Sequence, residues 1–91
     1  MIKTFTIGGI KWTVKEDNNR LEEMGLLGLC ETSKSLISIF SEVDTMLVEQ
    51  TIYHEAVHAI LESMGENRLS RNERFVQNFA LLLHQFEITK I

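Results

Sequence analysis

Two of the three histidines in the chain, His54 and His58, stand four residues apart, and Glu55 directly follows the first. On a helix, which rises about 1.5 Å per residue, residues four apart lie one turn apart on the same face. Two imidazoles in this position can converge on one cation. Glu55 is rotated by about 100° from His54, so its carboxylate can instead reach a water on that cation. This arrangement matches the pattern H-E-x-x-H, which places two metal ligands and one general base on a single helix.

Zinc is the metal that this pattern predicts, because zinc binds nitrogen and oxygen ligands and keeps a fourth position open for water in catalytic sites. The alternative interpretation is an amphipathic helix that carries two histidines by chance. The position of the pentapeptide in the middle of a predicted helix favours the metal site. The longer motif with a glycine and a third histidine downstream is absent, since Leu61 and Met64 occupy those positions.

The third ligand must therefore come from elsewhere, and elimination leaves two residues. Glu62 would form a row with the two histidines along one face, at about 6 Å per step, which fits a tetrahedron poorly. Glu66 follows the predicted helix end, and Glu87 lies at the far end of the next helix. Glu73 and His84 remain, about 16 Å apart along that helix, so one metal cannot bind both. The choice depends on which end of the second helix crosses the histidines.

Two helices are predicted to carry these residues. The first runs from about Asp44 to Met64, where glycine is absent and apolar residues recur at helical spacing. Ser41 or Asp44 could cap its start, and Gly65 would end it. After a polar stretch at residues 66–72, a second amphipathic helix is predicted, and we expect its apolar stripe to face the core. The stripe comprises Phe75, Phe79, Leu82, Leu83 and Phe86.

The first forty residues are predicted to form strands. Segments 3–7 and 10–14 alternate in polarity, and Gly8-Gly9 between them suits a tight hairpin turn. Strands followed by helices predict an α+β domain, with a small antiparallel sheet of three to four strands and the helices on one face. A loop is predicted at residues 15–24. Two more strands are predicted at residues 25–30 and 36–40.

Length and composition restrict the function classes. The 91 residues fit one domain, 1–91, and 44% hydrophobic with 24% charged residues is typical of a globular protein. A net charge of −4 without a basic stripe argues against nucleic-acid binding. The apolar runs are far shorter than the roughly 20 residues of a membrane span, and Met1 is not followed by a signal-peptide core. A single cysteine, Cys30, excludes an internal disulfide, so we expect a cytoplasmic protein with no membrane partner.

The segments Thr51–Ile60 (TIYHEAVHAI) and Glu73–Ala80 (ERFVQNFA) together resemble the ImmA/IrrE-type metallopeptidases, and the small phage and mobile-element members are especially similar. The resemblance covers roughly residues 25–86. It implies a zincin-like fold in which His54, His58 and Glu73 hold Zn²⁺ and Glu55 is the catalytic carboxylate. It therefore favours Glu73 over His84 as the third ligand.

The expected function is a zinc-dependent endopeptidase that hydrolyses peptide bonds in a protein or peptide substrate. Family members are associated with inactivating repressors of mobile elements, so the resemblance implies a transcriptional repressor or another regulatory protein as partner. An edge strand near the helix could pair with an extended substrate, and strand 36–40 is the candidate, although the sequence does not identify which strand lies at the edge. The alternative is a non-catalytic antirepressor or host-protein-binding module that keeps the fold. Three ligands favour catalysis, since structural zinc sites usually have four.

Four further side chains could have a role either in the site or in the fold. Cys30 is expected to pack as a small hydrophobe rather than to act as a fourth ligand. Tyr53, next to His54, is expected to point away from any oxyanion. Thr51 could orient a ligand through a hydrogen bond. Trp12 is expected to be part of the core.

Overall fold

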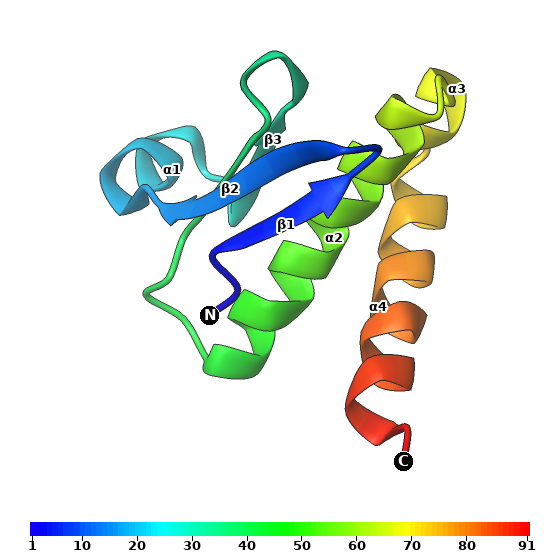
Figure 1. The fold of residues 1–91 in the computed structure, drawn as a ribbon. Coiled ribbons are helices and arrows are strands. Elements are labelled where there is room, and N and C mark those ends of the chain that lie inside the picture. Colours follow the sequence, from blue (N-terminus) through cyan, green and yellow to red (C-terminus); the bar gives the residue numbers. More distant parts are fainter.

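The computed structural model describes all 91 residues and has an α+β architecture, as the sequence predicts (Figure 1). The strands are β1 (Thr4–Ile7), β2 (Ile10–Glu16), β3 (Gly28–Glu31) and β4 (Leu36–Ile39). The α-helices are α1 (Asn18–Met24), α2 (Thr45–Ser63), α3 (Asn67–Ser70) and α4 (Glu73–Thr89), and a 3₁₀ turn, η1 (Thr32–Lys34), joins β3 to β4. None of the helices combines the length and the apolar character that crossing a membrane requires.

The four strands form one mixed sheet in the order β1-β2-β4-β3. Strands β1 and β2 form an antiparallel hairpin in which Ile7 pairs with Ile10. Gly8 and Gly9 between them have φ values of 58° and 79°, which confirms the predicted tight turn. Strands β3 and β4 are also antiparallel, but β2 and β4 run parallel. The prediction of a purely antiparallel sheet is therefore wrong at this one pair.

The parallel pair arises because α1 carries the chain from the end of β2 to the far edge of the sheet. The sequence predicts a loop over residues 15–24, but most of this segment is helical and buries Leu21 completely. Gly25 ends α1 in the left-handed conformation, at a φ of 69°, and its N–H bonds to the carbonyls of Leu21 and Glu22. The predicted third strand therefore begins later, at Gly28. The chain then turns back, and β4 enters the sheet between β2 and β3.

Helix α2 lies between the sheet and α4 (Figure 1). The Asp44 carboxylate caps its start by accepting a hydrogen bond from the N–H of Met46 at 3.3 Å, and Gly65, with a φ of 78°, follows its end. The predicted bounds therefore agree with the structure within one residue. One apolar face of α2 packs against the sheet, where Trp12 is 2% exposed as predicted. The sheet-side core consists of Trp12, Val14, Ile37, Ile39, Val48, Ile52 and Ala59.

Helix α4 uses a different face from the one that its apolar stripe predicts. Its buried residues are Val76, Ala80 and His84, and the first two pack against Val57 and Leu61 of α2. In contrast, the exposed fractions of Phe79, Leu82 and Phe86 are 49%, 65% and 59%. The prediction that this stripe faces the core is therefore wrong for these three residues, whereas Phe75 packs partly buried against the α2–α4 core and Leu83 is half-buried. The small side chain of Ala80 suits close packing of two helices, whereas the bulkier Phe79, Leu82 and Phe86 remain exposed.

Candidate metal centre

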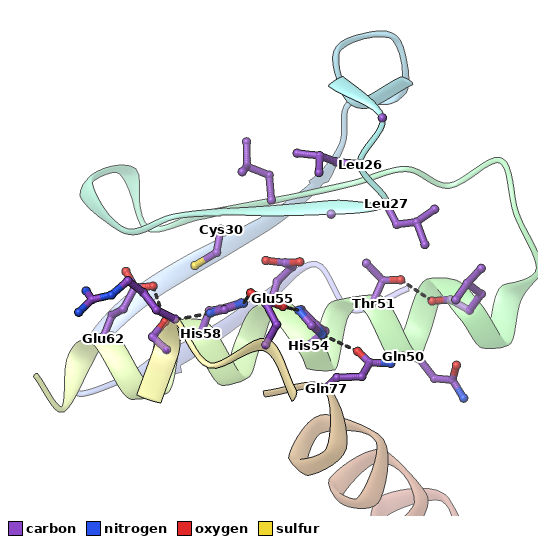
Figure 2. Close-up of a pocket in the computed structure, with 17 residues that line it drawn as sticks. Leu26, Leu27, Cys30, Gln50, Thr51, His54, Glu55, His58, Glu62 and Gln77 are labelled. Atoms are coloured by element: carbon purple, nitrogen blue, oxygen red, sulfur yellow. Dashed lines mark hydrogen bonds and ion pairs between the residues drawn. The ribbon is translucent and has the colours of Figure 1, made fainter. Parts of the chain in front are cut away.

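A cleft of about 840 Å³ lies between β3, α2 and the start of α4 (Figure 2). Its volume is in the range of small-molecule and substrate sites, roughly 300–1,000 Å³. Figure 2 shows β3 running above α2 and roughly along it, with Glu55 pointing from the helix toward the strand. Helix α2 contributes His54, Glu55 and His58 to the lining of the cleft, and α4 contributes its first residue, Glu73. The cleft therefore contains all four residues that the sequence predicts for the site.

The structure brings the three predicted ligands together. His54 Nε2 lies 3.2 Å from one carboxylate oxygen of Glu73, and His58 Nε2 lies 3.3 Å from the other. One ligand atom from each residue lies within 4.8 Å of the other two. The position of Glu73 follows from local structure, because the Asn72 side chain accepts a hydrogen bond from the N–H of Phe75 at 3.1 Å and so begins α4 at Glu73. The two histidines are mostly buried, whereas Glu73 is 68% exposed and leaves the site open to solvent.

Hydrogen bonds on the far side of both rings determine where the imidazole protons lie. His54 Nδ1 is 2.7 Å from the amide oxygen of Gln77, an atom that can only accept. His58 Nδ1 is 2.9 Å from Ser70 Oγ, whose own hydrogen is donated to Glu62 Oε2 at 2.9 Å. Ser70 must therefore accept from His58. Both histidines thus carry their proton on Nδ1.

The chemistry of this donor set fits a metal cation. In the neutral form of each ring, a proton on Nδ1 leaves the lone pair of Nε2 directed toward the Glu73 carboxylate. Three electron-rich groups then face one another at 3.2–3.3 Å, and a cation bound between them would offset their mutual repulsion. Two imidazole nitrogens and one carboxylate form a known catalytic zinc set. His54, His58 and Glu73 are therefore the residues that could hold Zn²⁺.

Glu55 is a buried carboxyl group beside the three ligands. Glu55 is only 8% exposed and lies on the side of α2 that faces β3. The pKa of Glu55 is raised to about 7, chiefly by burial; the Coulombic interaction with His54 lowers it, and the negative charges of Glu73 and Glu62 raise it. The Glu55 carboxyl is not among the groups that converge as ligands. It is therefore placed to act on a molecule in the cleft rather than on the metal.

Gly28 is the residue of β3 that leaves room for Glu55. A Cβ atom at this position would lie 2.7 Å from Thr51 Cγ2 and 3.0 Å from both Cγ and Oε2 of Glu55. The shortest of these distances is one that real Cβ atoms essentially never show. Only glycine therefore permits β3 to approach α2 this closely.

Gly28→Ala is expected to destabilise the fold by about 1–3 kcal/mol, which is the usual cost of overpacking. The added methyl must move either Glu55 or the strand, because Glu55 lies 3.0 Å from its position and the strand carries it. Urea unfolding of Gly28→Ala, of Thr51→Ser and of the double variant measures the effect. Thr51→Ser removes the clashing methyl and should restore part of the lost stability. Wild-type stability in Gly28→Ala would show that the contact does not constrain the strand.

The remaining predicted residues lie outside the group of ligands. His84 is 2% exposed and packs edge-on against Tyr53, with ring centroids 5.0 Å apart. This contact also keeps Tyr53 away from the cleft. Thr51 Oγ1 donates to the carbonyl of Leu47 at 2.7 Å, so it bonds to its own helix rather than to a ligand. Burial and the charges of Glu62 and Glu55 raise the pKa of Cys30 to about 12, which keeps this thiol protonated.

Sequence reasoning missed the roles of four residues at the site, Gln77, Ser70, Glu62 and Gly28, and it considered Glu62 only as a metal ligand. The helical period could have identified two of them, because Gln77 lies four residues after Glu73 and Glu62 four residues after His58. Ser70 and Gly28 gave no such signal, since their roles depend on how α3 and β3 meet α2.

Comparison with known proteins identified no relative of this chain. No protein-family model, no curated protein and no solved structure matches it. The functional assignment therefore depends on the residues and the geometry of the cleft.

Proposed function

We propose that the chain is a zinc-dependent endopeptidase with a zincin-like fold, related to the ImmA/IrrE-type metallopeptidases. The observation that carries the proposal is the convergence of His54 Nε2, His58 Nε2 and the Glu73 carboxylate, with the buried Glu55 beside them. An arrangement of three protein ligands favours catalysis over a purely structural zinc site, which usually has four. The family resemblance makes a repressor or another regulatory protein the first substrate to test.

In the proposed hydrolysis, the residues of the cleft have two separate roles. His54, His58 and Glu73 would hold the metal, and Glu55 would take a proton from the attacking water and return it to the leaving amine. Zinc, when bound, would acidify that water and polarise the scissile carbonyl. The wall formed by β3 covers Glu55, whereas the exposed side of Glu73 leaves an approach for the substrate.

Strand β3, rather than β4, is the edge strand beside the proposed catalytic residues. The prediction that residues 36–40 form an edge is wrong, because β4 lies between β2 and β3. One side of the β3 backbone has no strand neighbour, and β3 lines the cleft. An extended peptide can add to such an edge through backbone hydrogen bonds. Leu26 and Leu27, just before β3, are 37% and 43% exposed at the same cleft, which favours substrates with apolar side chains.

The proposal is tested by incubating zinc-loaded protein with a mixture of unstructured peptides and with candidate repressors. Mass spectrometry of the products is expected to show new termini that depend on zinc. Chelation should stop cleavage, and added zinc should restore it. Tight zinc binding without cleavage of any peptide would overturn the peptidase assignment and favour the binding module.

Zinc removal is also expected to lower the melting temperature. The ligands come from two helices, and an ion that binds only the folded state stabilises it by about 2.7 kcal/mol at a hundredfold excess over Kd. For a domain of this size that corresponds to a shift of roughly 10–20 °C. Differential scanning calorimetry with and without chelator measures it, and His58→Ala is the control that should show no zinc-dependent shift. Identical curves for loaded and stripped wild-type protein would argue against the site.

A further inference from the structure

Glu62 connects three elements behind the metal ligands. Its Oε2 accepts a hydrogen bond from Ser70 of α3 at 2.9 Å, and its Oε1 accepts one from Thr32 of η1. Ser70 Oγ in turn lies 2.9 Å from His58 Nδ1. A continuous path of hydrogen bonds therefore runs from His58 through Ser70 to the Glu62 carboxylate (Figure 2).

We propose that Ser70 and Glu62 are positioning residues that hold the His58 ring with its Nε2 lone pair directed at the metal. The inference rests on the proposed function, since it assumes a cation at Nε2. Ser70 has only one hydroxyl hydrogen, and the carboxylate takes it because an ionised carboxylate can only accept. The serine oxygen is then left to accept the Nδ1 proton of His58. Glu62 thus fixes the tautomer of His58 without touching it.

Burial protects this path of hydrogen bonds from water. Ser70 is 5% exposed, and the side chain of His58 is 14% exposed, so water has little access to replace either hydrogen bond. Ring nitrogens on the far side of metal-binding histidines commonly bond to such partners, and loss of the partner typically lowers metal affinity by about 10- to 100-fold. The bond from Thr32 is different, because it reaches the other oxygen of Glu62 and joins η1 to α2 without lying on the path to His58.

The first test compares zinc affinity in three variants by competition with a chromophoric chelator. Ser70→Ala removes the acceptor for His58 and should weaken zinc binding by about 10- to 100-fold. Glu62→Gln keeps an acceptor oxygen but loses the charge, so its loss should be smaller. Thr32→Val is the matched control, because it removes one hydrogen bond to Glu62 and leaves the path intact. It should bind zinc like the wild type.

The second test reads the tautomer in zinc-free protein and does not depend on activity. Long-range ¹H–¹⁵N spectra at about pH 8, above the usual histidine pKa of about 6.5, distinguish Nδ1–H from Nε2–H. Wild type and Thr32→Val should show His58 with its proton on Nδ1. In Ser70→Ala the Nε2–H form, which can donate to Glu73, should gain population.

The outcomes separate this proposal from the proposed function. If Ser70→Ala and Thr32→Val lose the same affinity, or if Ser70→Ala keeps wild-type affinity and tautomer, the positioning role is overturned while the metal site stands. A wild-type chain that binds no zinc overturns the proposed function, and the tautomer spectra still test the hydrogen-bond path. Circular dichroism of each variant establishes that it is folded.

Discussion

Glu55→Gln is expected to abolish peptide hydrolysis while zinc still binds at one ion per chain. Glu55 lies beside the ligands but is not one of them, so its loss should remove proton transfer and leave metal binding intact. A positioned general base contributes about 10²- to 10⁴-fold to the rate. A fall of this size would take a weak peptidase below detection. Product analysis by mass spectrometry and metal analysis of the same sample measure both quantities.

Glutamine is a suitable replacement because the site of Glu55 is tightly packed. The side chain lies against Gly28, where a Cβ atom would come within 3.0 Å of Glu55 Cγ, and glutamine keeps the same shape. Burial raises the pKa of Glu55 to about 7, so a neutral amide should cost the fold little. Any loss of activity can then be assigned to proton transfer. Undiminished cleavage by Glu55→Gln would remove the general-base assignment. Retained inactivation of a partner without cleavage would favour the binding module.

The site is easier to predict than the fold because its main residues lie close together in the sequence. His54, Glu55 and His58 belong to one helix, and the helical period alone determines that both histidines share a face. The Gly8-Gly9 turn is equally local, because two positive φ values favour glycine at both positions. In each case, fewer than ten neighbouring residues contain the required information.

Long-range arrangements were not predictable in the same way. The parallel pairing of β2 with β4 depends on α1, whose only fully buried residue is Leu21, so its apolar signal is weak. The edge strand beside the cleft follows from that topology. The buried face of α4 depends on how closely it approaches α2, and the helical period of its apolar residues indicates the exposed side. Periodicity identifies apolar faces but does not identify their partners.

Glu73→Ala is expected to weaken zinc binding far more than His84→Ala, although histidine is in general the commoner zinc ligand. The sequence left both residues open, about three helical turns apart on α4. In the structure, the oxygens of Glu73 lie 3.2 Å and 3.3 Å from the Nε2 atoms of His54 and His58. The nearest carboxylate to His84 is instead Glu49, at 3.9 Å. Loss of a ligand should exceed the roughly 10- to 100-fold cost of losing a supporting hydrogen bond.

The two variants should also differ in stability, and in the opposite order to their zinc affinity. Glu73 is 68% exposed in the first turn of α4, where a negative charge contributes only about 0.3–1 kcal/mol through the helix dipole. His84 is buried against Tyr53, and large-to-alanine changes in a core cost about 2–5 kcal/mol. Glu73→Ala should therefore lose affinity and keep its stability, and His84→Ala should do the reverse. Zinc titration gives the zinc affinity of both proteins, and urea unfolding gives their free energies of unfolding. If His84→Ala instead loses zinc while Glu73→Ala retains it, the opposite end of α4 supplies the third ligand.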